Sequence, residues 1–312
     1  MKKETYRGHV AMLVANFAWG FLSPLSKAVL LNSDVSPLAL TTFRITGGAI
    51  TFWIASLFVK RESVERRDML MLALASIFAI VFNQVSFIKG VSLTSPIDAS
   101  IITTTLPIIT MIVSAFYLKE AITWKKIVGI TFGASGALLL IVSGHHSGSR
   151  SSSVWGDLLC LLAQFSFTIY LVWFKGLIGK YSPVTLMKWM FTFASLFCLP
   201  LSFNQLTTIN YSLLPTPVYF DIAFIVLAGT FLGYLLIPIG QRNLRPTEVS
   251  MYNYLQPVVA SVLSLIWGMD TFGVMKGIAV ALVFSGVYIV TQNISFQFSF
   301  PSFKKIKEGY RI

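Results

Sequence analysis

Ionisable side chains occur inside apolar stretches of this chain, where little water is available to solvate them. Arg44 lies deepest in such a stretch, while Lys27, Asp98, Lys175 and Glu248 lie closer to the ends of theirs. The guanidinium group of an arginine presents a fixed fork of N–H donors that binds a carboxylate or phosphate. The same donors can instead bond the carbonyl groups of neighbouring helices. For Arg44 we keep both interpretations, an anchor for an anionic ligand and a packing residue.

Amide, hydroxyl and aromatic side chains are interspersed through the same stretches. A polar side chain in an apolar helix needs hydrogen bonds that lipid cannot provide, so it either bonds another helix or lines a polar cavity. Both roles are open for these residues. Together with Arg44, those that we expect to line a cavity are Asn16, Trp19, Asn83, Gln84, Thr103, Thr104, Gln164, Tyr234, Asn253, Tyr254 and Gln256.

Two prolines fall in the middle of apolar segments that otherwise favour a helix. A proline inside a helix removes a backbone hydrogen bond and costs about 3 kcal/mol. Pro107 and Pro257 should therefore kink their helices and free carbonyl groups there. Pro96 and Pro246 read instead as first residues of helices, where the missing N–H is harmless. Kinks of this kind persist where a cavity or polar neighbours satisfy the freed groups, so they predict a cavity wall.

The composition identifies the environment of these segments. Apolar residues are 55% of the 312 residues and charged residues only 12%, and the mean hydropathy is +0.75. A soluble domain carries about 25% charged residues, which it needs to cover a surface that faces water. The chain therefore reads as an integral membrane protein in contact with a lipid bilayer.

Ten segments are long enough to cross a bilayer as helices, which need about 20 apolar residues each. Helices are expected because unpaired backbone groups are costly in lipid, and the runs are too long for barrel strands. The predicted fold is all-α, with spans at 9–31, 37–59, 69–90, 96–118, 124–143, 154–175, 183–204, 219–241, 246–268 and 272–293.

The distribution of Lys and Arg predicts how the spans are oriented. Eighteen of the 24 basic residues fall in the termini and loops of one side, and such residues favour the cytoplasm. Both termini are therefore expected in the cytoplasm, and the chain in the inner membrane of a bacterial cell. The eighteen residues are Lys2, Lys3, Arg7, Lys60, Arg61, Arg66, Arg67, Lys119, Lys125, Lys126, Lys175, Lys180, Arg242, Arg245, Lys304, Lys305, Lys307 and Arg311.

Several other classes of function find no support in the sequence. The net charge of +12 comes from short clusters between apolar runs, which favours membrane topology over nucleic-acid binding. Cys160 and Cys198 lie in apolar runs and do not suggest a disulfide framework. The pair His145–His146 is a weak metal signal, so neither a metal nor a cofactor is expected. No HExxH, GxSxG or Walker motif occurs, so no catalytic residue is predicted.

The chain contains an internal repeat. A shift of 150 residues aligns Pro96 with Pro246, Asp98 with Glu248 and Pro107 with Pro257, and a shift of 148 aligns Lys27 with Lys175. Each copy holds five spans, so the second copy must enter the membrane upside down, a signature of transporters. The predicted divisions are an N-terminus 1–8, a first repeat 9–143, a linker 144–153, a second repeat 154–293 and a basic aromatic tail 294–312.

The repeated ionisable residues have two open interpretations. Asp98 and Glu248 fall in the first turn of a helix, where a carboxylate satisfies free N–H groups and opposes the helix dipole. Proton coupling is the alternative for this pair. Lys27 and Lys175 can extend to the membrane interface, or they can take part in gating or coupling.

The runs NFAWGFLSPLSK from Asn16, the FR of TTFRITGG, and TSPIDASIITTTLPIITMIVSAFYLKE from Thr94 resemble the EamA-type branch of the drug/metabolite transporter superfamily. The resemblance covers about 8–293. It implies ten helices, with one to four and six to nine around a central cavity, five and ten to one side, and alternating access. Members move small metabolites, often amino acids. The second copy departs from the pattern at Phe167, Thr168 and Met190, which align with Trp19, Gly20 and Arg44.

Together these observations predict a secondary transporter of small metabolites, amino acids or related compounds with an anionic group, and favour export. A non-transporting receptor or scaffold, and an intramembrane enzyme without a familiar motif, are the alternatives. Gly129 and Gly133 form a GxxxG pattern in the fifth span that fits packing within the monomer. It fits equally a homodimer through the fifth and tenth spans.

Overall fold

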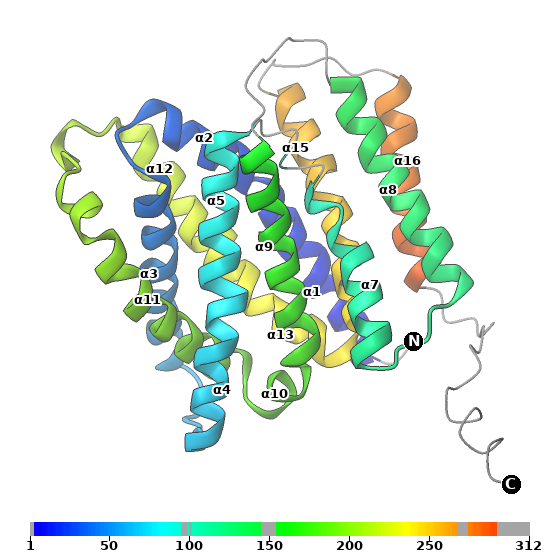
Figure 1. Cartoon of the computed structure of the whole chain (residues 1–312), viewed down its shortest axis with the longest axis horizontal. Coiled ribbons are helices and arrows are strands. Elements are labelled where there is room, and N and C mark those ends of the chain that lie inside the picture. The colour runs from blue at the N-terminus through cyan, green and yellow to red at the C-terminus, as the bar shows by residue number, and fades with distance from the viewer. Residues whose placement is uncertain (1–2, 95–98, 100–101, 145–153, 267–273, 292–312) are drawn as a thin grey trace, which may run out of the picture.

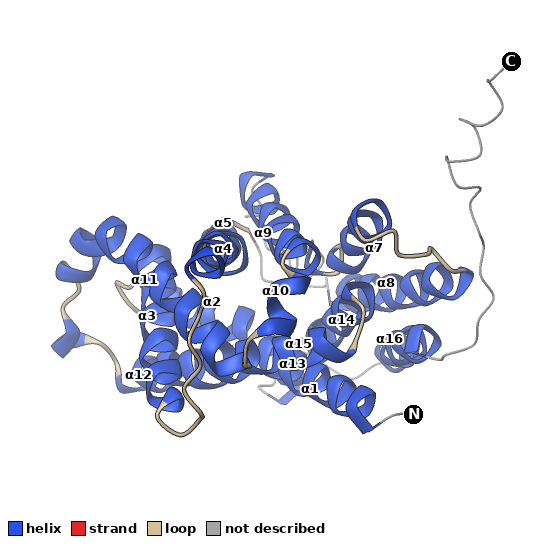
Figure 2. Cartoon of the chain, turned by 90° about the horizontal axis from the view of Figure 1, so that it is seen from below, coloured by secondary structure: helices blue, strands red, loops and turns tan. Residues whose placement is uncertain are grey.

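The chain forms a bundle of helices in a computed structural model that describes residues 3–94, 99, 102–144, 154–266 and 274–291 (Figure 1). Every regular element in these residues is a helix (Figure 2). The elements are α1 Lys3–Gly20, α2 Leu22–Asn32, α3 Pro37–Ser56, α4 Arg66–Ser76, η1 Ile77–Phe82, α5 Asn83–Leu93, α7 Leu106–Tyr117, α8 Trp124–Gly144, α9 Val154–Trp173, α10 Lys175–Lys180, α11 Pro183–Thr207, η2 Tyr211–Leu213, α12 Thr216–Phe224, η3 Ile225–Leu232, α13 Gly233–Asn243, α14 Pro246–Met251, η4 Tyr252–Tyr254, α15 Leu255–Ile266 and α16 Val274–Thr291.

Six helical stretches in the described residues are long and apolar enough to cross a membrane. Four further helices, α7, α8, α15 and α16, lie where other spans are expected. Residues 95–98, 100–101 and 267–273, which belong to the expected fourth, ninth and tenth spans and their loops, lie outside the described residues. The total of ten crossings stays a prediction. The six stretches are Glu4–Asn32, Pro37–Ser56, Arg66–Leu93, Val154–Trp173, Pro183–Thr207 and Thr216–Asn243.

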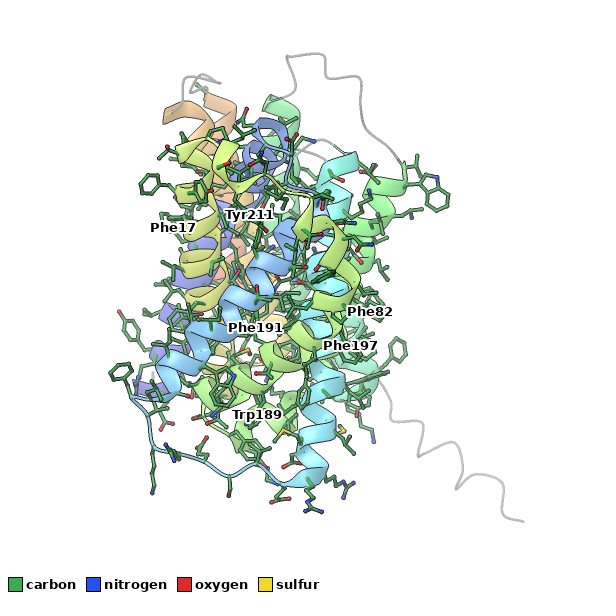
Figure 3. All side chains as sticks on the ribbon, turned by 90° about the vertical axis from the view of Figure 1, so that its left-hand side faces the viewer. Phe17, Phe82, Trp189, Phe191, Phe197 and Tyr211 are labelled. Atoms are coloured by element: carbon green, nitrogen blue, oxygen red, sulfur yellow. The ribbon has the colours of Figure 1, made fainter. Side chains whose placement is uncertain are left out.

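The side chains on these helices separate an apolar outer surface from a packed interior. Phe17, Phe82 and Phe197 stand out from the bundle with about half of their surface exposed, whereas Phe191 is fully buried (Figure 3). An outer surface of large apolar side chains suits contact with lipid tails rather than with water. The interior is formed mainly by side chains of α3, α4, α9, α11 and α13.

Basic loop residues gather at one end of the bundle, which we call the basic end. It comprises residues 60–66, 118–123, 174–182 and 243–246, and it lies at the bottom of Figure 1. The opposite end comprises 32–37, 93–94 and 208–216. α1 runs from the basic end to the opposite end, whereas its repeat partner α9 runs the other way (Figure 1).

Four stretches depart from regular α-helix within the bundle. η1 and η3 are π-helical segments, and they occupy matching places in the two halves. η4 is a turn of 3₁₀-helix, and it ends three residues before Pro257. α7 begins at Leu106, one residue before Pro107, after a turn at Thr104 and Thr105. Both mid-span prolines therefore follow a break in the α-helix, as their missing N–H groups require.

α8 and α16 pack against each other at one edge of the bundle (Figure 1). A Cβ atom on Gly286 would lie 2.6 Å from the carbonyl oxygen of Gly129 and 2.6 Å from the nitrogen of Gly133. The GxxxG face of α8 is therefore occupied by α16 of the same chain. A homodimer through α8 and α16 stays a prediction, and it would have to use their other faces.

Candidate functional site

A half-open cavity with several polar groups in its wall lies between the two halves of the bundle. Its empty volume is about 680 Å³, which includes open solvent at the mouth. Its wall combines one arginine with amides, hydroxyls and aromatic rings, a mixture typical of a small-molecule site. The lining residues are Trp19, Gly20, Leu22, Ser23, Arg44, Asn83, Gln84, Phe87, Thr103, Gln164, Phe167, Tyr234, Asn253 and Gln256.

Arg44, from α3, is the charged group of this wall. Its side chain is 3% exposed, and its Nε donates a hydrogen bond to Oγ1 of Thr230 at 3.3 Å. None of the ion pairs in the described residues includes Arg44. A guanidinium group has five N–H donors, so most of its donors are available to a ligand in the cavity. A buried charge with spare donors suits a carboxylate or a phosphate.

Gln84, from the first turn of α5, is a second unsatisfied group on the wall. It is 1% exposed, and neither its amide nitrogen nor its amide oxygen makes a hydrogen bond of good geometry within the described residues. Buried polar groups are nearly always paired, so such an amide requires an explanation. An amide presents a donor and an acceptor side by side, and it therefore fits a ligand that carries both.

The π-helical segments bring these groups to the cavity. Gln84 follows η1 by two residues and Tyr234 follows η3 by two, and a shift of 150 relates the two positions. Thr230 lies within η3, and its hydroxyl donates to the carbonyl oxygen of Ile225, five residues earlier, at 3.0 Å. π-helical turns often occur at functional sites because they shift the side chains that follow. Here they place one polar side chain from each half on the wall.

Trp19 joins α1 to the second half of the chain. Its Nε1 donates to the carbonyl oxygen of Gly229 at 2.8 Å. A Cβ atom on Gly233 would lie 2.3 Å from that same nitrogen, so only glycine leaves room for the indole ring. The ring meets Phe167 and Tyr234 edge to face, with centroids 5.8 and 5.6 Å apart. These contacts hold an aromatic cluster on the cavity wall.

Nine of the twelve residues expected at a cavity line this one, and three do not. Asn16 lies one layer behind the wall, where its Oδ1 accepts from Nε2 of Gln256 at 3.0 Å. Thr104 is buried beside the break before α7. Tyr254 turns towards α8: its ring occupies the space over Gly133 and its hydroxyl donates to the carbonyl oxygen of Ile130 at 3.4 Å. Its polar atom is thus satisfied away from the cavity.

The repeated lysines make matching contacts at the two ends of the bundle. Nζ of Lys27 donates to the carbonyl oxygens of Val91 at 3.1 Å and Thr94 at 3.4 Å. Nζ of Lys175 donates to the carbonyl oxygen of Leu244, the counterpart of Thr94, at 3.4 Å. Each lysine thus caps the C-terminus of a helix, where free carbonyls and the helix dipole favour a cation.

The repeated acids were expected at helix N-termini. Glu248 occupies the first turn of α14, and its Oε2 accepts from the backbone nitrogen of Arg245 at 2.8 Å. Asp98 lies outside the described residues. The capping contact gives Glu248 a structural role, and coupling through either acid stays a prediction.

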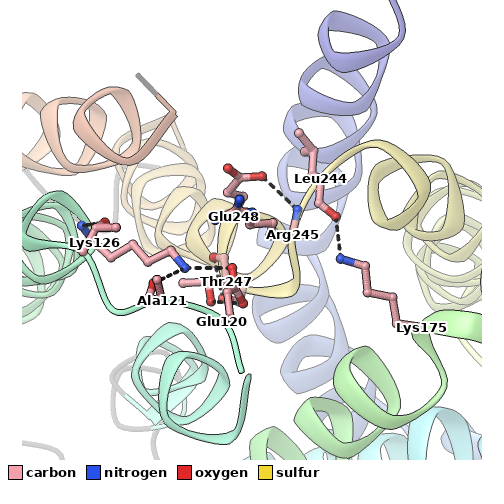
Figure 4. Close-up of polar contacts among 10 residues, drawn as sticks. Glu120, Ala121, Lys126, Lys175, Leu244, Arg245, Thr247 and Glu248 are labelled. Atoms are coloured by element: carbon pink, nitrogen blue, oxygen red, sulfur yellow. Dashed lines mark hydrogen bonds and ion pairs between the residues drawn. The ribbon is translucent and has the colours of Figure 1, made fainter. Parts of the chain in front are cut away.

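A buried ion pair in the first half is linked to the second half by a hydrogen bond at the basic end (Figure 4). α7 ends through Lys119 in a left-handed conformation (φ 53°), and the chain then brings Glu120 to the start of α14. Oε1 of Glu120 lies 2.8 Å from Nζ of Lys126, with both side chains 7% exposed. Oε2 of Glu120 accepts from the hydroxyl of Thr247, in the other half, at 3.1 Å.

A second polar cluster at the basic end also bridges the halves. Nζ of Lys180 lies 2.6 Å from Asp68 and 2.9 Å from Glu65. The hydroxyl of Tyr181 donates to Oδ2 of Asp68 at 2.6 Å. Hydrogen bonds to Asp68 and Glu65 raise the pKa of Lys180 above its ordinary value. These contacts tie the start of α4 to the loop before α11.

Two matching helical halves with a polar cavity between them are the architecture of a secondary transporter. The model called EamA-like transporter family matches residues 6–142 and again 154–292, and the chain belongs to this family. With its apolar helices, it is a multi-pass membrane protein of the drug/metabolite transporter group.

Individual relatives are distant but cover most of the chain. The uncharacterized transporter YyaM of Bacillus subtilis is 24% identical over 275 residues, which cover 88% of this chain and 86% of YyaM. A protein of Streptantibioticus cattleyicolor named a probable terminal-alkyne amino-acid exporter is 22% identical over 283 residues, 91% of this chain and 93% of its own. A solved crystal structure superposes with a TM-score of 0.73 at 18% identity, covering 93% of this chain and 97% of the other, which establishes likeness of fold.

Several residues of the site were missed from the sequence. Thr230, Ser23 and Phe87 carry no distinctive pattern, because single hydroxyls and phenylalanines are common in apolar helices. Phe167 could have been found, since the repeat aligns it with Trp19. The pairing of Glu120 with Lys126 depends on a loop geometry that spacing alone does not predict.

Proposed function

We propose that this chain is a secondary active transporter that moves small metabolites with an anionic group, amino acids or related compounds, by alternating access through the central cavity. The proposal rests most heavily on Arg44, a buried cation with unused donors on the cavity wall. A carboxylate placed there would gain charge-assisted hydrogen bonds that two N–H groups can form at once. No other described residue offers the cavity a full positive charge.

Gln84 and the aromatic cluster suggest how the rest of the substrate is held. The amide of Gln84 can accept from an amine and donate to a carboxylate, a combination that an α-amino acid presents. The rings of Trp19, Phe167 and Tyr234 offer an apolar surface for a side chain, and their faces attract an ammonium group. The name of the Streptantibioticus relative agrees with this class of substrate and with export.

For orientation we propose that the basic end faces the cytoplasm of a bacterial cell. The loops there carry the Lys and Arg residues that favour the cytoplasmic side. The cavity then opens away from the cytoplasm, because its lining residues lie in the middle and opposite-end parts of their helices. The two polar clusters at the basic end would hold the cytoplasmic side closed.

Counterflow in proteoliposomes tests this function. Vesicles containing the purified protein are loaded with an unlabelled amino-acid mixture, and labelled amino acids are added outside at trace concentration. A transporter should give a transient accumulation of label that protein-free vesicles lack. Folded protein that gives no accumulation with amino acids, and then none with other small carboxylates or with sugar phosphates, would contradict the proposal.

A further inference from the structure

Four buried side chains outside the cavity have polar atoms without hydrogen-bond partners in the described residues: Ser26, Ser114, Tyr170 and Gln241. Tyr170 and Gln241 are the largest of them. Tyr170 on α9 is fully buried and its hydroxyl is unpaired. Gln241 on α13 is 2% exposed, and both atoms of its amide are unpaired. An unpaired polar group in a membrane protein interior is costly, and the fold would avoid this cost with apolar residues. Their presence therefore calls for a second state in which these atoms are solvated.

Both side chains extend a stripe that begins at the cavity. On α9, Gln164 and Phe167 line the cavity, and Tyr170 and Leu171 follow one turn nearer the basic end. On α13, Tyr234 lines the cavity, and Ile237 and Gln241 follow at spacings of three and four residues. Residues at these spacings share one face of a helix. The stripes thus run from the cavity floor towards the basic end.

The internal repeat points independently to the same region between the cavity and the basic end. Leu22, Ser23, Arg44 and Phe87 line the half of the cavity that lies nearer the opposite end. The repeat aligns them with Tyr170, Leu171, Met190 and Ile237, and all four of these counterparts are fully buried. An inverted repeat exchanges the roles of its halves when the transporter changes state. The buried set therefore corresponds to a second vestibule that is packed shut here.

We propose that Tyr170, Leu171, Ile237 and Gln241 line a vestibule through which the cavity opens at the basic end. The Tyr170 hydroxyl and the Gln241 amide are the polar groups of this vestibule, and they hydrogen-bond water and the polar parts of a passing substrate once it opens. Met190, at the position matching Arg44, leaves this vestibule without the guanidinium group. This inference rests on the proposed function, since it describes the second access state of the same cavity.

One of the contacts that hold this vestibule closed is the hydrogen bond between Glu120 and Thr247. It joins the loop after α7 to the start of α14, across the two halves (Figure 4). Replacing Thr247 by valine removes only the inter-half hydrogen bond and keeps the side-chain volume. The ion pair between Glu120 and Lys126 stays intact, so no buried charge is left unpaired. Thr247→Val is therefore the variant that should favour opening without unfolding the protein.

Thiol labelling in membranes tests the vestibule without any substrate. Leu171→Cys and Val172→Cys are neighbours on α9, and both positions are fully buried. Val172 lies one turn after Thr168 and therefore shares its face of α9. Thr168 contacts the hydroxyl of Thr110 on α7, so this face points to α7 and not to the proposed vestibule. Each variant is treated with a small maleimide, and labelling is measured above that of the wild-type chain, whose Cys160 and Cys198 are buried.

Leu171→Cys should react about tenfold faster than Val172→Cys, because labelling follows the population of the open state. Adding Thr247→Val should accelerate Leu171→Cys further and leave Val172→Cys unchanged. The proposal would be overturned if both cysteines reacted slowly and at the same rate, with and without Thr247→Val. It would also be overturned if Thr247→Val accelerated both reactions equally, because that would indicate looser packing of the whole bundle. Selective labelling in a protein that shows no counterflow would support the vestibule while contradicting the proposed transport function.

Discussion

Arg44 of α3 and Thr230 of η3 are joined by a hydrogen bond of 3.3 Å across the two halves of the chain. The hydroxyl hydrogen of Thr230 is already directed to the carbonyl oxygen of Ile225, so its lone pair is available to the arginine. The contact fixes the position of the guanidinium group without neutralising its charge. Arg44 is therefore oriented and still able to bind an anion, which is the state that a recognition site requires.

Replacing Thr230 by valine should weaken substrate binding through Arg44. The variant removes the acceptor that orients the guanidinium and leaves a buried donor unpaired, at a cost of about 1–3 kcal/mol. Counterflow measured over a range of substrate concentrations should show a raised KM. Thr110→Val is the matched control, because Thr110 bonds Thr168 between α7 and α9 and does not line the cavity. An unchanged KM in Thr230→Val would show that Thr230 does not orient Arg44 for substrate binding.

Gln84→Leu should make the protein more stable while reducing transport. The amide makes no hydrogen bond of good geometry in the described residues and only lies close to the Tyr234 hydroxyl, so an apolar side chain of similar volume removes a poorly paired buried group, worth about 1–3 kcal/mol. Asn83→Leu should have the opposite effect on stability. Asn83 donates to the carbonyl oxygen of Ala163 at 3.0 Å and accepts from the hydroxyl of Tyr234 at 3.4 Å. Thermal unfolding in detergent compares the two variants, and a lower Tm for Gln84→Leu would contradict the interpretation of Gln84.

Gly286→Ala should separate α8 from α16. The new methyl group would meet backbone atoms of Gly129 and Gly133, which cannot move aside as a side chain can. Overpacking of this kind typically costs about 1–3 kcal/mol, so the Tm should fall. Gly179→Ala serves as control, since a Cβ there meets nothing within 4 Å. Equal melting temperatures for the two variants would show that the α8–α16 contact is less close than described.

Glu62 at the basic end should make the stability of the protein depend slightly on pH. Stability should fall as the pH drops below the ordinary pKa of a carboxyl group, because Glu62 then becomes protonated. Burial raises the pKa of Glu62, but hydrogen bonds from Ser182 and Thr185 and the charge of Arg242 lower it more, and the net pKa lies below its ordinary 4.5. A depressed pKa contributes stability above the unfolded value that is lost as pH falls through the folded value. Because Glu62 is exposed, the effect should be under about 1 kcal/mol.

Glu62→Gln should flatten this part of the stability profile. The test is thermal unfolding of both proteins at pH 7 and at steps below pH 4.5, where only the wild type should show the additional loss. Parallel profiles for the two proteins over this window would assign the acid sensitivity to other groups.

The class of the protein and much of the cavity could be predicted because both depend on patterns that can be recognised along the sequence itself. Apolar runs of bilayer length are set by the solvent, and a repeat remains visible through its prolines, as with Pro107 and Pro257. Arg44 and Gln84 could be singled out because such groups are costly in an apolar helix. Each of these signals is local or periodic.

Other features depend on how helices meet, and the sequence carries no trace of them. The π-helical segments η1 and η3 insert a residue into a helix without a distinctive composition. Tyr254 was expected at the cavity because it lies between Asn253 and Gln256, but the 3₁₀ turn of η4 rotates it towards α8. The pairing of Glu120 with Thr247 joins residues 127 positions apart, and only the folded bundle brings them together.

Counterflow by Arg44→Gln, compared with Arg44→Lys and the wild type, tests the central claim most directly. Removing the charge should reduce accumulation of labelled amino acids about 100-fold, the effect of losing about 3 kcal/mol of charge-assisted hydrogen bonds. Arg44→Lys should retain part of the activity, since it keeps the charge and loses the fork. Tm measurements establish that each variant is folded. A folded Arg44→Gln protein with counterflow equal to the wild type would show that Arg44 is a packing residue and would contradict the account.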